Sequence, residues 1–84
     1  MEKRIALIGI IVEDTTMIEQ LNRLLHDYSE YIIGRMGIPY KERGVNIISV
    51  ALDAPMPAIS ALSGKIGALS GMQVKTIYAK SKDE

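Results

Sequence analysis

The chain has 84 residues, enough for one small domain that buries only about 60% of its extended surface, so its core is marginal when alone. Its ten basic and ten acidic residues give a formal net charge of zero, which excludes a general attraction to nucleic acid or to an anionic membrane. It contains no cysteine, which excludes disulfides, thiol catalysis and cysteine-based metal sites and is compatible with the reducing cytoplasm, where we place the protein.

The first predicted element is a strand over residues 5–12, because this run is entirely aliphatic and rich in β-branched residues. Glu13 and Asp14 follow it without a cleavage-like stretch, which favours a buried strand over the core of a signal peptide. No segment approaches the roughly 20 apolar residues of a membrane span, so we expect no membrane partner.

A helix is predicted to follow this strand. Asp14, Thr15 and Thr16 are candidate N-caps, and Thr16 with Glu19 fits a capping box. The apolar side chains that then share one helical face are Ile18, Leu21, Leu24, Leu25 and Tyr28. His26, the only histidine, lies near the helix end, where we expect exposure to solvent rather than metal binding.

Two further strands are predicted in the middle of the chain, over residues 31–38 and 45–52. Pro39 is expected to stop the first of them. The segment PYKERG makes the connection, and its Gly44 can take a positive φ.

A second helix and a last strand complete the pattern. Pro55 and Pro57 are compatible with a helix start, and the apolar stripe that follows consists of Ile59, Leu62, Ile66 and Leu69. Gly71 suits the position just past the helix end, and the final strand spans residues 72–79 before a charged tail, KSKDE. We therefore expect a single domain over residues 1–84, ordered from about 4 to 79.

The predicted order is βαββαβ, and its two halves repeat each other. Four apolar positions of the first helix match four of the second at a constant offset, as do the strands that follow. Each half is a strand–helix–strand unit with a right-handed crossover. Two such units interleave into a four-stranded antiparallel sheet with both helices on one face, which is the ferredoxin-like α+β arrangement.

The other face of this sheet is predicted to carry more aliphatic surface than a monomer can leave in water. Hydrophobic residues make up 48% of the chain, which is more than a small core uses. Strand alternation points Ile5, Leu7 and Ile11 one way and the even positions from Ala6 to Val12 the other. It likewise separates Val45, Ile47 and Ala51 from Ile48, Val50 and Leu52, so the uncovered face carries aliphatic side chains whichever set it holds. We expect a second copy of the sheet to cover them, in a homodimer or a homotetramer.

The segment ALSGKIGALSG, residues 61–71, raises the question of a phosphate site around Lys65. A P-loop has Gly-x-x-x-x-Gly-Lys followed by Ser or Thr, whereas Ile66 follows this lysine and Ile59 occupies the first glycine position. We interpret the segment as a helix with a small-residue face that includes Gly64. Close helix packing, or the approach of a partner, would then offset the roughly 1 kcal/mol that each glycine costs relative to Ala, and Lys65 is expected to be a surface charge.

Few residues offer catalytic chemistry. Glu13 and Asp14 would need a pocket and a partner to act as a general acid–base pair, and capping is the better interpretation. A ferredoxin-like dimeric barrel enzyme would need an acid or base between the sheet and the helices, and the alternation places none there. An RNA-recognition module shares the topology, but Val45 and Ile47 are aliphatic where that module stacks bases on aromatic side chains.

Arg35 interrupts an otherwise apolar strand and lies in a polar set with Tyr40, Lys41 and Arg43. This arginine could bind an anionic ligand at a subunit edge or pair with an acidic side chain of a neighbouring copy. We favour the second role.

The segments IIVED, LLHDYSEYIIGRMGIPY and ISALSGKIGALSGMQVKT resemble a small bacterial family of proposed regulators of the iron-only hydrogenase system. The resemblance extends from Ile5 to about Tyr78. That family is similar to ACT domains and to the C-terminal sensing domain of the nickel-responsive repressor. The resemblance implies an ACT-like regulatory domain that oligomerises through its sheets.

The chain departs from these relatives at the places where they bind ligands. The nickel repressor uses clusters of His and Cys, so with one His and no Cys we expect no metal and no cofactor here. ACT domains commonly bind amino acids in the loop after the first strand, at a subunit interface. The matching loop gives Glu13, Asp14, Thr15 and Thr16 as candidate ligand-binding residues, although it lacks the glycine often found there. Arg35 and Arg43 of the polar set are the other candidates.

The sequence thus predicts a small non-enzymatic, oligomeric regulatory domain that binds a small-molecule effector or a protein partner, without direct contact to nucleic acid. The alternatives are a structural assembly module without a ligand and, less favoured, a dimeric barrel enzyme.

Overall fold

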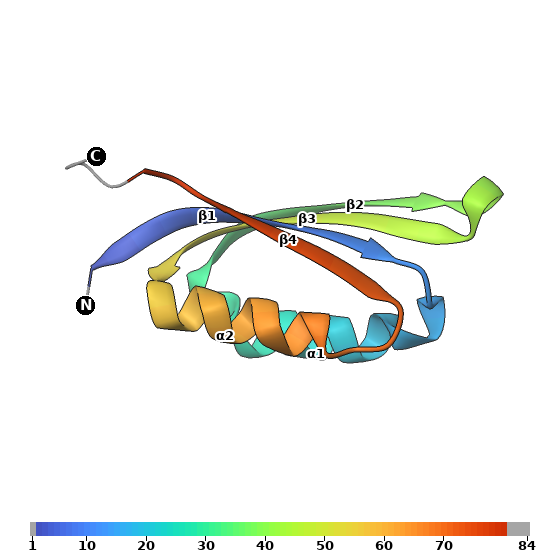
Figure 1. Ribbon diagram of the computed structural model, residues 1–84, viewed down its shortest axis with the longest axis horizontal. Helices are drawn as coiled ribbons and strands as arrows, with labels where there is room; N and C mark the ends of the chain where they lie inside the picture. The colour runs from blue at the N-terminus through green and yellow to red at the C-terminus, as the bar shows by residue number, and fades with distance from the viewer. Residues whose placement is uncertain (1, 81–84) are drawn as a thin grey trace.

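The computed structural model describes residues 2–80 and contains one four-stranded sheet with two helices on a single face (Figure 1). The strands are β1 (Lys3–Val12), β2 (Ile32–Tyr40), β3 (Val45–Pro55) and β4 (Met72–Tyr78), and the helices are α1 (Ile18–Asp27) and α2 (Met56–Gly67). Three short 3₁₀ turns, η1 (Thr15–Met17), η2 (Ser29–Tyr31) and η3 (Lys41–Arg43), join them. The part of the predicted charged tail over 81–84 lies outside the described residues.

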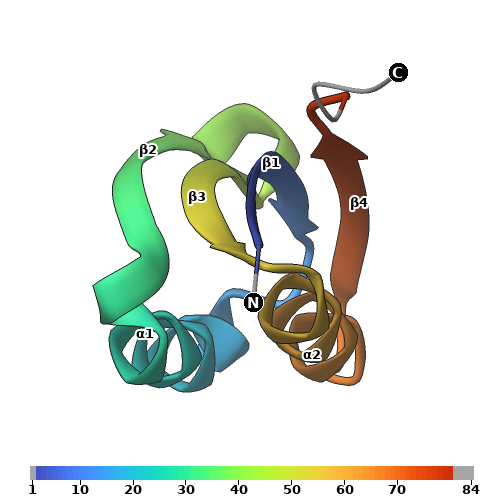
Figure 2. The ribbon, with the colours of Figure 1, turned by 90° about the vertical axis from the view of Figure 1, so that its left-hand side faces the viewer.

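The strand order is β2-β3-β1-β4 and every neighbouring pair is antiparallel. Figure 2 shows α1 beneath the β2 side of the sheet and α2 beneath the β4 side. The predicted ferredoxin-like βαββαβ fold, which is compatible with an ACT-like domain, is therefore confirmed.

The sheet has one buried and one open face. Along β1, the side chains at even positions from Ala6 to Val12 are at most 2% exposed and face the helices. The odd positions point the other way, and Ile5, Leu7 and Ile11 remain 41–49% exposed. We call this second side the open face. On β3 and β4 it carries the residues that pair with odd β1 positions, which are alternate residues from Ile47 to Asp53 and from Gln73 to Ile77. The predicted alternation of both central strands is confirmed, and the structure shows that the odd positions of each form the uncovered side.

The space between the sheet and the helices is filled by aliphatic side chains. The largest fully buried side chains are Ile8, Ile10, Leu21, Leu52, Ile59, Leu62, Ile66, Val12 and Val50. No polar or charged residue is buried among those that the structure describes. Within the same part of the chain, neither helix combines the length and the apolar character that a membrane crossing requires.

Two strands extend beyond their predicted ends. β2 continues through Pro39 to Tyr40, because β2 is an edge strand and a proline there removes no hydrogen bond from the interior of the sheet. β3 continues past Leu52 to Pro55, where it pairs with Lys3. The expectation that Pro39 ends the second strand is therefore wrong.

Both helix ends also differ from the predicted pattern. The capping box between Thr16 and Glu19 is absent, because α1 begins after Met17, which makes no side-chain capping bond. Asp14 instead caps η1, and its Oδ1 accepts the backbone N–H of Thr16 at 3.1 Å. α2 ends at Gly67, so Gly71 does not terminate the helix. It turns the chain into β4 with φ of 72°.

The small-residue face of α2 does not pack closely against the rest of the chain. A Cβ placed on Gly64 or on Gly67 would find no heavy atom within 4 Å. Close packing within the chain is therefore wrong as an explanation of these glycines. The approach of a partner stays a prediction.

Candidate functional site

The junction between β1 and α1 is held by hydrogen bonds from several of the predicted ligand-binding residues. The backbone N–H of Glu13 donates to the Gly71 carbonyl at 2.7 Å, and Glu13 Oε1 accepts from Gln73 Nε2 at 2.7 Å. Asp14 Oδ1 accepts from the Thr16 backbone and hydroxyl. These contacts close η1 and tie the end of β1 to the start of β4, while Thr15 lies exposed in the same turn.

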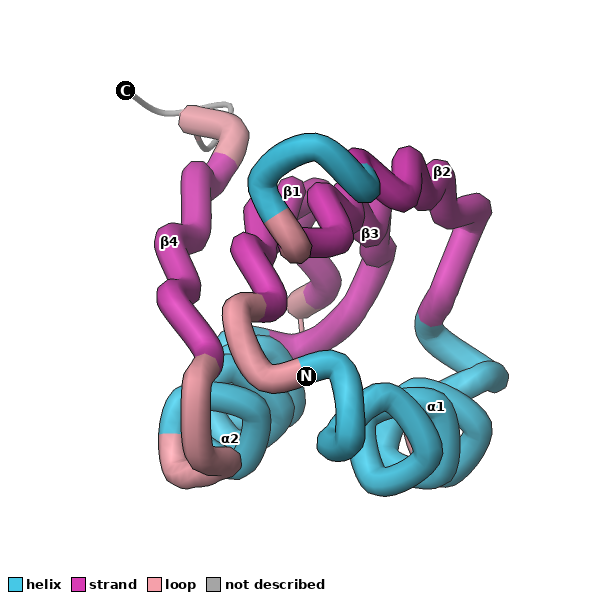
Figure 3. Tube along the Cα trace, turned by 90° about the vertical axis from the view of Figure 1, so that its right-hand side faces the viewer, coloured by secondary structure: helices cyan, strands magenta, loops and turns pink. Residues whose placement is uncertain are grey.

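The two candidate arginines lie in different places. Arg43 belongs to η3, the turn between β2 and β3, which stands away from the β1–α1 junction at the same end of the molecule (Figure 3). Arg35 lies within β2, opposite the buried Val50, and therefore projects toward the side of the sheet that carries α1. The structure thus brings together Glu13, Asp14, Thr15 and Thr16 but neither of the two arginines.

Arg35 is part of a groove between α1 and β2. Two adjoining depressions, with volumes of 240 and 420 Å³, share Asn22 and Arg35 in their walls. The other side chains that line them come from both elements, from η2 and from β3: Ile18, Leu25, His26, Ser29, Ile32, Ile38, Pro39, Asn46 and Ile48. The groove combines an apolar floor with a few polar groups, as small-molecule sites do.

The charge in this groove comes from Arg35, which is exposed and forms no hydrogen bond or ion pair with another described residue. A guanidinium presents a planar fork of N–H donors that matches a carboxylate or a phosphate. Asn22, Ser29 and Asn46 add amide and hydroxyl groups beside it. The groove can therefore hold a small anion with an apolar part.

Sequence reasoning identified Arg35 but not the residues around it. Asn22 and His26 lie four residues apart and therefore share one face of α1. That spacing is the feature of the sequence that could have placed these two residues together. It indicates a site only once α1 is known to lie beside β2.

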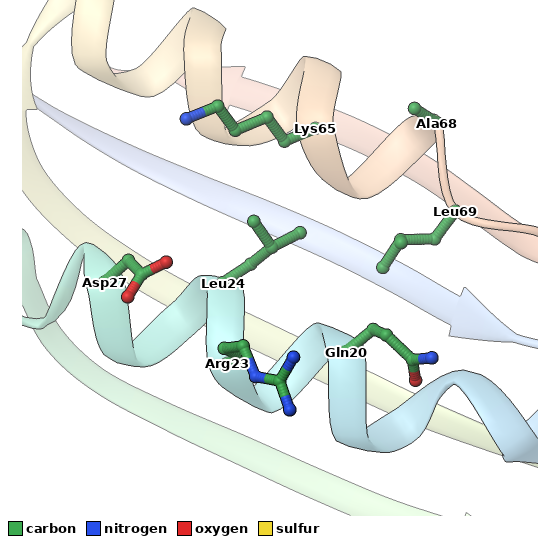
Figure 4. A pocket seen from close by; sticks show the side chains of 7 residues that line it. All are labelled: Gln20, Arg23, Leu24, Asp27, Lys65, Ala68 and Leu69. Carbon is green, nitrogen blue, oxygen red and sulfur yellow. The ribbon is translucent and has the colours of Figure 1, made fainter.

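A second cleft lies between the two helices, with a volume of 340 Å³ (Figure 4). Leu24 and Leu69 point into it, and Arg23, Asp27 and Lys65 stand at its edges. A third depression, of 380 Å³, lies on the open face over Gly9, where the missing side chain leaves space between β3 and β4.

Lys65 is exposed, as predicted, but it also links the two helices. Its Nζ donates a hydrogen bond to the Tyr28 hydroxyl at 3.0 Å and lies 5.1 Å from the centre of the Tyr28 ring. The hydrogen bond and the charge of a deprotonated Tyr28 favour the ammonium form, so they raise the pKa of Lys65. No group of three or more His, Cys, Asp or Glu side chains that could hold a metal ion occurs among residues 2–80.

The comparisons with known proteins point to one family. Residues 4–76 match a family model named TM1266-like and described as "Iron-only hydrogenase system regulator, putative". No curated protein matches the chain significantly. Among solved structures, uncharacterized protein TM1266 from Thermotoga maritima is 41% identical with a TM-score of 0.90, over 94% of this chain and 100% of that one.

Two more distant structures share the fold alone. A formyltetrahydrofolate deformylase from Pseudomonas putida KT2440 has 14% identity and a TM-score of 0.63, over 87% of this chain and 28% of the enzyme. An unknown protein from Galdieria sulphuraria has 18% identity and a TM-score of 0.64, over 95% and 47% of the two chains. Since the family model spans most of the sequence and TM1266 is similar along nearly all of it, the chain belongs to the TM1266-like family.

Proposed function

We propose that this chain is a non-catalytic regulatory domain of the iron-only hydrogenase system, which works in the cytoplasm as an assembly of identical copies and binds a small anionic effector. The description of its family supports the link to the hydrogenase and a regulatory rather than an enzymatic role. The open face of the sheet supports assembly, because exposed aliphatic surface of this kind marks interaction sites.

The observation that carries the binding part of the proposal is the position of Arg35 in the groove between α1 and β2. Arg35 makes no hydrogen bond or ion pair with any other residue of the 2–80 stretch, and on a largely apolar strand its guanidinium is available to an anion. Ile18, Ile32 and Pro39 provide apolar contact next to it. The effector class that fits is a carboxylate or phosphate carried by a small organic molecule, such as an amino acid or a nucleotide.

The effector site can be tested by thermal unfolding with inorganic phosphate, with glutamate and with AMP, each added separately. We expect at least one of them to raise the unfolding temperature, by roughly 10 °C at a hundredfold excess over its dissociation constant. Arg35→Ala should abolish the shift, whereas Arg43→Ala, which removes the same charge from the η3 turn, should keep it.

An equal shift in the Arg35→Ala variant would contradict the site, and no shift with any of the three compounds would contradict an effector of this class.

The same two variants test the regulatory role in cells that lack the native chain. There Arg43→Ala should restore the normal level of hydrogenase activity and Arg35→Ala should not. Unchanged hydrogenase activity after deletion of the chain would contradict the regulatory role itself.

A second candidate function is that of a structural assembly module without a ligand. The open face favours it, since that face alone supplies an apolar contact surface without any contribution from Arg35. Copies that assemble but respond to none of the three compounds would identify this second function.

A further inference from the structure

Besides Lys3 at the start of β1, two opposite charges interrupt the apolar open face of the sheet. Lys75 on β4 pairs with Gly9 of β1, and Asp53 on β3 pairs with Ile5 of the same strand, so both side chains lie on the open side. Neither forms an ion pair or a hydrogen bond with another described residue. A sheet that covered this face with apolar groups alone would leave Lys75 without compensation, which is costly for a buried charge.

The register places these two charges symmetrically about Leu7. β1 lies between β3 and β4, and Leu7 is the residue of β1 midway between Ile5 and Gly9. Lys75 therefore lies one strand away from Leu7 on the β4 side, level with Gly9, two residues further along β1. Asp53 lies one strand away on the β3 side, level with Ile5, two residues earlier in β1.

This symmetry makes the open face complementary to itself. We infer that a second copy of the chain packs on the open face about a two-fold axis through Leu7, so that Lys75 of each copy pairs with Asp53 of the other. A two-fold interface brings a surface patch against the same patch of its partner, so a single arrangement forms both ion pairs at once. The inference rests on the proposed assembly and specifies its geometry.

The apolar side chains around Leu7 fit the same arrangement. Leu7 is 42% exposed and would meet its own copy at the axis, while Ile5 and Ile77, 49% and 66% exposed, would meet each other across the interface. With ordinary strand spacing and rise, the strands of the two sheets would cross at about 70°, close to orthogonal sheet packing. Ile11 and Ile47, at the far end of the open face, would lie outside this contact.

The arrangement is tested by reversing the charges singly and together, with sedimentation and far-UV circular dichroism as measurements. Lys75→Glu and Asp53→Lys each place two like-charge pairs in the dimer, so each variant alone should weaken dimerisation roughly 1000-fold or more while the chain stays folded. An equimolar mixture of the two variants should form a heterodimer, because both of its pairs are opposite in charge. The chain that carries both reversals should dimerise by itself.

Lys41→Glu is the matched control, since it changes the net charge as Lys75→Glu does but lies in the η3 turn. It should dimerise alone and should not restore the Asp53→Lys variant. Single variants that dimerise as well as the native chain, or a mixture that stays monomeric, would overturn this arrangement while leaving an assembly through the open face intact. A native chain that sediments as a monomer would overturn the assembly as well.

Discussion

Three glycines of the second half of the chain occupy very different surroundings. Gly64 and Gly67 lie on the outer side of α2, and a Cβ at either position would meet nothing within 4 Å. Gly71 has a φ of 72°, and a Cβ there would lie 2.5 Å from Cβ of Asp14. The segment ALSGKIGALSG therefore contains one glycine that the fold requires and two that make no close contact within a single chain.

Alanine substitutions should separate these roles. Gly64→Ala and Gly67→Ala should each raise the free energy of unfolding by about 0.5–1 kcal/mol, because alanine has the higher helix propensity and restricts the unfolded chain. Gly71→Ala should lower it by about 2 kcal/mol or more, because the left-handed conformation and the contact with Asp14 both become unfavourable.

Urea unfolding at low protein concentration measures these three changes. A loss of stability in Gly64→Ala or Gly67→Ala that appears only at high protein concentration would mean that another chain approaches α2 closely at that glycine, which the single copy does not show.

At this scale the candidate site was only partly predictable. Arg35 stands out in the sequence because it interrupts an apolar run, and Asp14 stands out as a cap. Asn22 and Asn46 come from two other elements, and nothing in their own neighbourhoods shows that folding places both beside Arg35. Residue type identifies a charged group, whereas tertiary contact determines what surrounds it.

Among the elements, β2 departs most from a regular alternation. Ile32 pairs with Leu52 and Gly34 pairs with Ala51, so Ile33 is an additional residue that forms a β-bulge. Without the bulge, Ile32 would share the open side with Gly34. With it, Ile32 turns to the helix side and packs against the main hydrophobic core, while Ile33 is left 63% exposed.

The bulge predicts unequal effects for two adjacent isoleucines. Ile32→Ala should lower the free energy of unfolding by about 2 kcal/mol, near the low end for core truncations because Ile32 is only half-buried. Ile33→Ala should change it by less than about 0.5 kcal/mol, as an exposed substitution does. Denaturant unfolding of the two variants provides the measurement, and equal losses would contradict the assigned register.

The elements themselves were largely predictable because both periodicities are strong in this chain. Alternation in β1 and β3 separates buried from open positions, and the apolar stripes of α1 and α2 match the side chains that fill the core. The ends were less predictable, because whether Pro39 stops a strand depends on its place at the sheet edge, and the bulge depends on pairing with β3.

The described part of the molecule forms two layers, with an apolar core between sheet and helices and the open face on the other side of the sheet. It measures 43 × 22 × 19 Å, and the helices lie on one side of the sheet while the β2–β3 hairpin projects past them (Figure 1). A chain of this size has a marginal core by itself. If copies associate through the open face, unfolding must also separate them, and stability then depends on protein concentration.

Thermal unfolding over a range of protein concentrations tests this dependence. For a dimer of this size we expect the unfolding temperature to rise by about 3–5 °C for each tenfold increase in concentration. Leu7→Gln should remove the dependence, because it places an amide at the centre of the open face. Met56→Gln is the matched control: Met56 is 39% exposed against 42% for Leu7, but it lies at the start of α2 on the helix side of the sheet. The control should keep the dependence of the native chain, and an unfolding temperature that is constant for the native chain would show that its open face stays uncovered.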